Sequence, residues 1–264
     1  MTLLAEYYNK FNEEKRFNSR HGLTEFRVSV NLINEYLKKI EQTGRDRADI
    51  SIFDIGAGTG RYSIYYADMG YDVSAIELVK HNVSRLKAKS DKVKARQGDA
   101  LNLKKYEDES FDVTLLFGPM YHLFGDENKT RALNEAIRVT KSGGYIFVAY
   151  CMNDYAVITH GFKDKNIISS IKNNKINESF KVTNGEEDLY DFVNLDDILR
   201  INGLCNAQRI DIISPDGPAN YIREELKKMS EEEFEIFIDY QIKNCRRQDL
   251  LGAGGHTVDV LRKG

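Results

Sequence analysis

The sequence predicts an α/β fold with a doubly wound, mostly parallel, seven-stranded sheet. Short β-branched segments alternate with stretches of helical length, as in successive βαβ units. A glycine-rich turn follows the first strand, and acidic residues stand at the ends of the first three strands, 23 and 22 residues apart. The expected strands are residues 50–55, 71–76, 93–96, 111–117, 145–150, 207–213 and 256–261.

Helices are expected wherever apolar residues recur every three or four positions. The first is marked by such a stripe from Leu23 to Ile40. Ser142-Gly-Gly144 is expected to end one helix and to turn the chain into the fifth strand. Ser230 and Glu233 have the spacing of a capping box at a helix start. The other expected helices are residues 61–69, 80–90, 128–140, 155–171 and 195–201.

Composition excludes several classes of protein. The chain has 264 residues with 38 basic and 41 acidic side chains, so its net charge of −3 disfavours bulk electrostatic binding of nucleic acid. No apolar run approaches the roughly 18 residues of a membrane span, and the polar amino terminus is unlike a signal peptide. Three widely spaced cysteines without a CxxC pair indicate reduced thiols rather than disulfides or a metal site. These features favour a cytoplasmic protein.

The most informative segment is Phe53-Asp-Ile-Gly-Ala-Gly-Thr-Gly-Arg61, where a strand enters a glycine-rich turn and a helix begins at once. Glycines allow a sharp turn and a close approach to a ligand, and the helix amino terminus offers free N–H groups. Glu77 follows the second strand, where its carboxylate could accept hydrogen bonds from two ribose hydroxyls. Asp99 follows the third strand. All of these groups are expected at the carboxyl edge of the sheet, where doubly wound folds bind ligands.

Two cofactors compete for such a site. A dinucleotide fold requires GxGxxG, but here the third glycine comes one residue early, and Arg61 replaces the final small residue. An arginine there would oppose the close packing of helix against strand, and no second mononucleotide-binding half is evident.

The chain resembles the class I (Rossmann-like) S-adenosylmethionine-dependent methyltransferases. The resemblance rests on Asp54-Ile-Gly-Ala-Gly-Thr-Gly60, Glu77-Leu78, Gln97-Gly-Asp-Ala100 and Phe111 to Phe117, in the family's order, with support from Tyr121-His-Leu123 and residues 133–144. It is close over residues 50–151 and looser afterwards. It implies a strand order of 3-2-1-4-5-7-6 with the last strand antiparallel.

The resemblance also implies how one domain of residues 1–264 is organised. Residues 1–45 would form an amino-terminal helical lid, residues 50–151 the cofactor-binding core, and residues 152–194 an acceptor-side insertion after strand 5. Residues 195–264 would supply the last strands and helices. A short strand is expected within the insertion, at residues 189–193.

The family's cofactor-binding residues can be placed on this sequence by its motifs. The loop with Gly56, Ala57, Gly58 and Gly60 would pass beneath the methionyl part of S-adenosylmethionine. Asp54 would order the loop or bind the cofactor's ammonium group, although it could also serve only as a loop cap. The remaining expected contacts are Glu77 to the ribose, Asp99 and Ala100 to the adenine, Leu78 and Leu101 for stacking, and Phe117 beside the methionyl chain. Asp99 could instead be only a turn residue.

The acceptor side is less well defined. His122, in the loop after strand 4, is the candidate base, with a structural capping role as the alternative. Tyr121 would line the pocket or pack, and Tyr7 and Tyr8 would form part of the lid or pack in a helix. By the resemblance, acceptor specificity would reside in residues 152–194, with His160, and at His256. For His256, which begins the last strand, a core or turn position is the preferred interpretation.

The loop after strand 4 lacks both the Asp/Asn-Pro-Pro-Tyr/Phe and the Pro-Cys motifs of nucleic-acid methyltransferases. A small-molecule acceptor is therefore expected, with protein and RNA acceptors and the oligomeric state left open. The product would be S-adenosylhomocysteine, and no metal is expected. The alternatives are an NAD(P)-dependent oxidoreductase and a non-catalytic regulator that binds S-adenosylmethionine.

Overall fold

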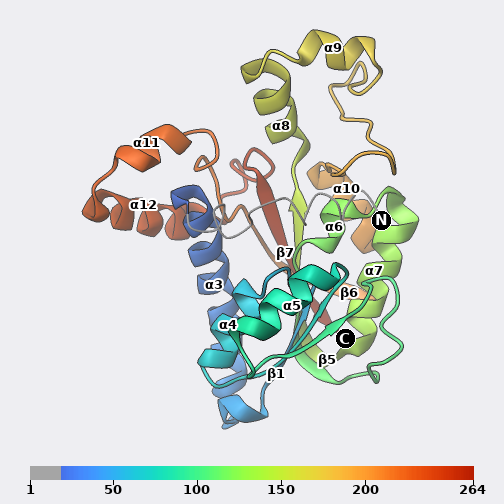
Figure 1. Ribbon diagram of the computed structural model, residues 1–264, viewed down its shortest axis with the longest axis vertical. Coiled ribbons are helices and arrows are strands. Elements are labelled where there is room, and N and C mark those ends of the chain that lie inside the picture. Colours follow the sequence, from blue (N-terminus) through green and yellow to red (C-terminus); the bar gives the residue numbers. More distant parts are fainter. Residues whose placement is uncertain (1–18) are drawn as a thin grey trace.

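The computed structural model describes residues 19–264 and confirms the predicted sheet (Figure 1). Its seven strands have the order β3-β2-β1-β4-β5-β7-β6, and β7 is antiparallel to both of its neighbours. The strands are β1 Ser51–Ile55, β2 Asp72–Glu77, β3 Lys94–Gln97, β4 Phe111–Leu116, β5 Thr140–Cys151, β6 Ala207–Ile213 and β7 His256–Lys263.

Helices cover both faces of this sheet (Figure 1). The helices before the insertion are α3 Arg20–Glu41, η1 Arg47–Asp49, α4 Arg61–Asp68, α5 Lys80–Lys89, α6 Pro119–His122 and α7 Gly125–Val139. Those that follow are α8 Asn153–Ala156, η2 Val157–Lys163, α9 Ile167–Lys172, α10 Leu195–Gly203, α11 Arg223–Lys228 and α12 Glu231–Asn244. None of these helices, within the described residues, is long and apolar enough to cross a membrane.

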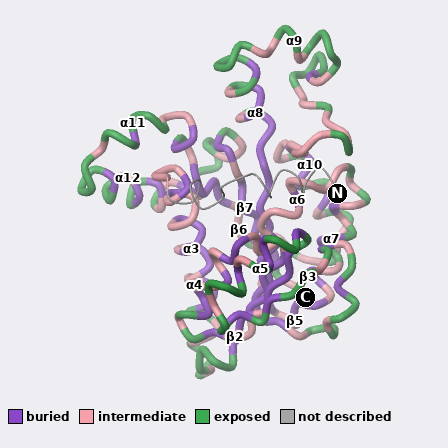
Figure 2. Tube along the Cα trace, in the orientation of Figure 1, coloured by how far each residue is buried: buried purple, intermediate pink, exposed green. Residues whose placement is uncertain are grey.

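The core consists of two layers, one on each face of the sheet. Successive strand residues point to opposite faces, so Ile52 joins the cluster beneath α3 and α4 while Phe53 joins the cluster beneath α7 and α10. The strands are accordingly the most buried part of the molecule (Figure 2). This double cover leaves the ends of the strands as the place where a ligand can approach.

The described part of the expected amino-terminal lid is α3, a packed helix. Its predicted apolar stripe is present, and Val28, Ile33 and Leu37 are buried against the sheet. Tyr7 and Tyr8 lie outside the described residues.

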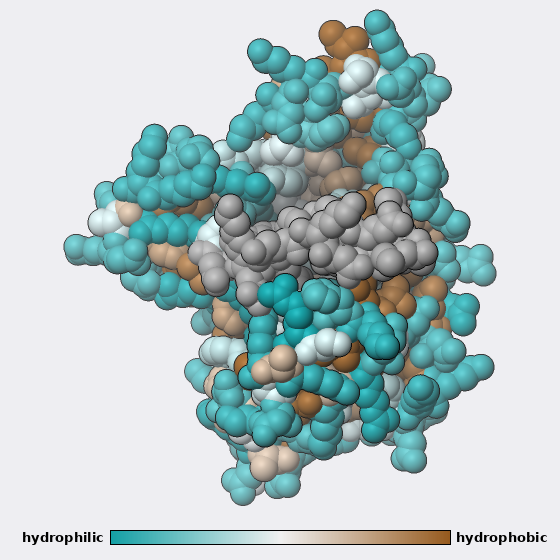
Figure 3. Space-filling model, viewed as in Figure 1, coloured by the Kyte–Doolittle hydropathy of each residue, from teal (hydrophilic) through white to brown (hydrophobic). Residues whose placement is uncertain are grey.

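The insertion differs from its prediction. The expected continuous helix at 155–171 is divided into α8, the π-helical η2 and α9, with Lys165 in a left-handed turn conformation. The expected strand at 189–193 is absent, because only Val193 forms a β-bridge, to Met152. The insertion extends away from the sheet and is largely exposed (Figures 1 and 2). Hydrophobic side chains gather near its tip (Figure 3), and Phe162 and Ile168 are more than half exposed.

Two smaller differences lie near the sheet. Residues 142–144, expected to form a turn, belong to β5, which begins at Thr140 directly after α7. Gly143 still has a positive φ of 76°, and the β4–β5 register shifts between Phe111 and Val113, so the glycines permit an irregular strand start. The six-residue helix α11 was not predicted because it is too short to show a period.

Candidate functional site

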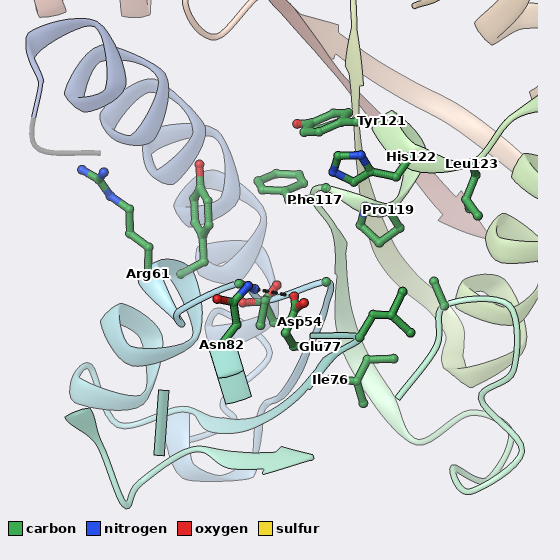
Figure 4. A pocket seen from close by; sticks show the side chains of 18 of the residues that line it. Asp54, Arg61, Ile76, Glu77, Asn82, Phe117, Pro119, Tyr121, His122 and Leu123 are labelled. Atoms are coloured by element: carbon green, nitrogen blue, oxygen red, sulfur yellow. Dashed lines mark hydrogen bonds between the residues drawn. The ribbon is translucent and has the colours of Figure 1, made fainter. Parts of the chain in front are cut away.

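A cleft lies at the carboxyl edge of β1, β2 and β4 (Figure 4). Its lining comes from the glycine-rich turn, the ends of these strands, α3, α6 and the start of β7. Nine of the eleven residues expected to bind a cofactor line it: Asp54, Gly56, Ala57, Gly58, Glu77, Leu78, Asp99, Ala100 and Phe117. Gly60 and Leu101 do not.

The glycine-rich turn is held against the end of β2. The N–H groups of Gly56 and Ala57 both donate to the carbonyl oxygen of Ile76, at 2.9 and 3.0 Å. Gly56 has a φ of +79°, and a Cβ there would lie 2.5 Å from Cδ of Pro119 at the start of α6. The turn therefore approaches α6 more closely than any residue with a side chain would allow.

Gly60 supports the turn from outside the cleft. It has a φ of +89°, and a Cβ there would lie 2.6 Å from Cγ of Leu86 on α5. Arg61 was expected to oppose close packing after the glycine-rich turn. The close contact is made instead by Gly60, one residue before Arg61. Arg61 instead lines the cleft, with its guanidinium 4.2 Å from the centre of the Phe26 ring.

Replacing Gly56 by alanine is expected to lower the free energy of unfolding by about 2 to 4 kcal/mol. The left-handed backbone and the contact with Pro119 both oppose a methyl group. Gly70 is the matched control, since its φ is +95° but a Cβ there would meet no atom within 4 Å. Gly70→Ala should cost only the backbone strain, about 1 to 2 kcal/mol. Urea unfolding of both variants measures the difference, and equal losses would contradict the role given to Pro119.

Asp54 connects the strand before the turn to the helix after it. Its side chain is 1% exposed, and one carboxylate oxygen accepts a hydrogen bond from Oγ of Ser63 on α4 at 2.5 Å. Asp54 also borders the cleft, near Glu77 (Figure 4). Both predicted roles, ordering the loop and facing a ligand, are compatible with this position.

Glu77 is held in the cleft by backbone hydrogen bonds to both of its carboxylate oxygens. Its Oε2 accepts the N–H of Gly58 at 2.9 Å and its Oε1 accepts the N–H of Val79 at 2.8 Å. The side chain of Asn82, on the first turn of α5, also bonds to it. Burial raises the pKa of the Glu77 carboxyl, and the hydrogen bonds from Val79, Gly58 and Asn82 counteract this in part. Four lone-pair positions on a carboxylate leave room for further donors from a ligand.

Asn82 was missed by the sequence analysis. It is 3% exposed, and it lines the cleft beside Glu77 (Figure 4). The available signal was its position five residues after Glu77, on the first turn of an expected helix.

Asp99 and Leu101, both predicted to contact the adenine, lie in different surroundings. Asp99 is exposed and lines the cleft, while its Oδ1 accepts the N–H of Leu101 at 2.9 Å. It therefore does form the turn that was its alternative role, and its other oxygen is not needed for that turn. Leu101 packs on the core cluster beneath α7 rather than facing the cleft, because the turn directs it away.

His122 lies on the acceptor side, beside Tyr121 (Figure 4). Its Nδ1 lies 2.7 Å from the carbonyl oxygen of Leu189, which can only accept, so Nδ1 carries the proton. Burial lowers the pKa of His122 below its ordinary value, against the smaller opposing effect of the Leu189 hydrogen bond. The ring is therefore neutral near pH 7, with Nε2 as its basic nitrogen.

The returning end of the insertion is attached to α6 and α7 around His122. The N–H of Asp191 donates to the carbonyl oxygen of Tyr121 at 2.7 Å. The Asp191 carboxylate pairs with Lys129 of α7, whose side chain is 1% exposed. These contacts hold the end of the insertion against α6 and α7, while none of residues 152–194 itself lines the cleft.

His256, for which a core or turn position was preferred over a role in acceptor specificity, lines the cleft. Its Nδ1 is 2.8 Å from Oδ2 of Asp216, and its ring centre is 5.6 Å from that of Tyr121. Asp216 is fully buried in the loop after β6. Forty residues separate the two members of this pair, so no local motif indicated it.

Comparison with known proteins agrees with this geometry. A family model described as a methyltransferase domain matches residues 53–148. The chain is 38% identical over 99 residues to a demethylmenaquinone methyltransferase of Renibacterium salmoninarum, covering 37% of this chain and 40% of that protein. It is 28% identical over 138 residues to a glycine/sarcosine N-methyltransferase of Aphanothece halophytica, covering 49% of each. The chain thus spans less than half the length of these curated relatives.

A solved structure extends the likeness to most of the fold. A structure titled as a SAM-dependent methyltransferase from Methanosarcina mazei superposes with a TM-score of 0.55 at 14% identity, covering 85% of this chain and 96% of that one. At this identity the likeness concerns the fold alone.

Proposed function

We propose that this chain, which belongs to the class I S-adenosylmethionine-dependent methyltransferases, transfers a methyl group to a small-molecule acceptor by in-line displacement. The proposal covers the activity and the acceptor class, because the curated relatives are matched over less than half of their length. We also propose a cytoplasmic location, because the three cysteines are unpaired thiols.

One observation carries the proposal: Glu77 stands at the end of β2 with the glycine-rich turn bonded to it. The N–H of Gly58 on its carboxylate fixes the distance between the loop and the acid. A ribose bound at Glu77 would place the rest of the nucleoside toward Leu78 and Asp99 and the methionyl chain toward Gly56 and Phe117, all of which line the cleft. The residues present therefore suit S-adenosylmethionine.

S-adenosylmethionine, when bound, supplies a methyl group on a positively charged sulfur, which is reactive without further activation. The protein's residues then need to align the acceptor, exclude water and remove a proton where the acceptor carries one. Aromatic side chains suit the first two tasks: Phe117 and Tyr62 are packed edge to face at 5.0 Å and border the cleft. His122 has the tautomer that would accept a proton at Nε2.

The small-molecule acceptor is favoured by the enclosing elements. Leu189 and Asp191 of the insertion bond to His122 and Tyr121, which line one wall of the cleft, and α3 contributes Glu25 and Ser29 to another wall. A folded protein or an RNA helix would require a more open approach. The net charge of −3 points the same way for nucleic acid.

The test combines binding with transfer. Calorimetry should detect S-adenosylhomocysteine binding and no NADH binding, and the reverse result would favour the oxidoreductase. A labelled-methyl transfer screen against a cell extract, separated into small molecules, protein and RNA, should place the label in the small-molecule fraction. Binding of S-adenosylhomocysteine with no transfer to any fraction would favour a non-catalytic regulator.

A further inference from the structure

The Asp216–His256 pair occupies the acceptor side of the cleft and has no part in the proposed cofactor contacts. His256 is the first residue of β7 and pairs with Cys151, the last residue of β5. Because β7 runs antiparallel, its start lies at the same edge as the ends of the parallel strands. The His256 side chain is 12% exposed, and it borders the cleft.

Asp216 fixes the orientation of the His256 ring. Its Oδ2 lies 2.8 Å from Nδ1 of the ring and accepts a second bond from Nδ2 of Asn220 at 2.6 Å, while Oδ1 accepts the His256 N–H at 3.2 Å. A ring nitrogen bonded to a carboxylate carries the proton, so Nε2 is the nitrogen left for the cleft. Within residues 19–264, Nε2 makes no hydrogen bond.

Two glycines allow the backbone to pack directly against Asp216. A Cβ on Gly254 would lie 2.8 Å from Oδ1 of Asp216, and one on Gly255 would lie 2.7 Å from Oδ2. These two glycines of the Gly252-Ala-Gly-Gly255 segment therefore let the backbone approach a fully buried carboxylate. Burying a carboxylate is unfavourable unless it is paired and bonded on each oxygen, as Asp216 is. The hydrogen bonds on both oxygens fix the Asp216 carboxylate, and through it the orientation of the His256 ring.

The charged and titratable groups around His256 favour its protonated form. Burial alone would lower the pKa of His256, but the neighbouring acidic groups of Glu25, Cys151 and Asp216, together with the Asp216 hydrogen bond, hold it well above its ordinary value. Oε2 of Glu25, on α3, lies 3.8 Å from Nδ1. Among the described residues, Tyr121 on α6, Tyr155 on α8 and Arg223 on α11 also lie near the ring, and Arg223 donates to Tyr155 at 2.9 Å.

The two histidines of the cleft are therefore in opposite states. Burial lowers the pKa of His122 and favours its neutral ring, whereas the acids beside His256 raise the pKa of His256 and favour a protonated ring that presents an N–H. Environments that separate two titratable groups in this way often assign them different roles in one reaction. Both rings lie close to Tyr121, at 6.2 and 5.6 Å between ring centres.

We infer that His256 binds the methyl acceptor by donating a hydrogen bond from Nε2 to an oxygen atom of that acceptor, and that Asp216 is its positioning residue. This inference rests on the proposed methyltransferase function and extends it to the acceptor class. The acceptor carries a hydroxyl or carbonyl oxygen on an apolar, planar frame, since Tyr121, Phe117 and Pro119 line the same cleft. An ammonium group would meet an N–H donor at this point and is disfavoured.

Two variants separate an acceptor contact from a packing role. Asparagine places its amide near Nδ1, so His256→Asn keeps a partner for Asp216 but loses the donor in the cleft. Glutamine places its amide near Nε2, so His256→Gln keeps that donor. The probes are phenol and benzylamine, added to the full chain saturated with S-adenosylhomocysteine and followed by NMR of the imidazole signals of its five histidines.

Phenol should shift the His256 signals, should bind His256→Gln nearly as well as the wild type, and should bind His256→Asn about tenfold more weakly. Equal phenol affinity for both variants, no phenol binding to the wild type, or a His256 shift with benzylamine alone would overturn the inference. If the wild type binds phenol but not S-adenosylhomocysteine, the proposed function fails and not the acceptor contact.

Asp216→Asn tests the positioning residue in the same spectra. Loss of its charge should lower the pH at which the His256 ring gives up its proton, and the wild type recorded under the same conditions is the reference. An unchanged His256 titration would contradict the role given to Asp216.

Discussion

Glu77→Ala is expected to weaken S-adenosylhomocysteine binding at least about 100-fold. Two charge-assisted hydrogen bonds to ribose hydroxyls are together worth about 3 to 6 kcal/mol, and each 1.4 kcal/mol corresponds to a tenfold change in affinity. The substitution also leaves the N–H groups of Gly58 and Val79 without their partner, so the glycine-rich turn loses its attachment to the end of β2. Isothermal calorimetry measures the loss directly.

Two further variants show whether the effect is specific. Glu77→Gln keeps the volume of the side chain and one oxygen acceptor, so its loss of affinity should be smaller than that of Glu77→Ala. Asp72→Asn removes an acid from the other end of β2, where it pairs with Lys94 on the surface, and should leave the affinity unchanged. Circular dichroism verifies that each variant is folded. Wild-type affinity in folded Glu77→Ala would contradict the ribose contact.

Much of the fold was predictable because it depends on short-range patterns. The regular spacing of Asp54, Glu77 and Asp99 reflects one strand and one helix per step, and β1 and β2 appeared with boundaries within one residue of those expected. The capping box at Ser230 begins α12 as predicted. The strand order followed from the family resemblance and is confirmed.

The insertion was less predictable because its structure depends on contacts far along the chain. Residues 189–191 are held by Tyr121, His122 and Lys129 rather than by strand pairing. A short segment without alternation of apolar residues gives no signal of such contacts. The sequence therefore located the insertion but not its internal structure.

The cofactor side of the site was more predictable than the acceptor side for a related reason. The cofactor contacts lie on motifs that are local in sequence, within a few residues of a strand end. The acceptor side is assembled from α3, α6, the loop after β6 and the start of β7. Asp216 and His256 meet because β6 and β7 are neighbours in the sheet. Their contact could therefore not be predicted before the strand order was known.

His122→Ala is expected to lower the turnover number about 100-fold or more, with S-adenosylhomocysteine affinity unchanged. A positioned general base contributes about 100- to 10,000-fold to a proton transfer. The affinity should not change because the cofactor contacts proposed for this part of the cleft are made by Gly56 and Phe117, not by His122. Because burial lowers the pKa of His122, its basic form persists below the ordinary value of 6.5. The acid limb of the wild-type rate profile should therefore lie below pH 6.5, and initial rates of labelled-methyl transfer measure both effects.

A structural role for His122 makes the opposite prediction for a conservative variant. Asparagine can keep the hydrogen bond to the carbonyl oxygen of Leu189 and so keep the insertion attached, but it has no basic nitrogen. If His122 is the base, His122→Asn is as slow as His122→Ala, because the attachment without the base does not help proton removal. If His122 only holds the insertion, His122→Asn retains most of the wild-type rate, and the assignment as a base is wrong. His160→Ala, at an exposed position on η2 outside the cleft, should leave the rate and its pH profile unchanged.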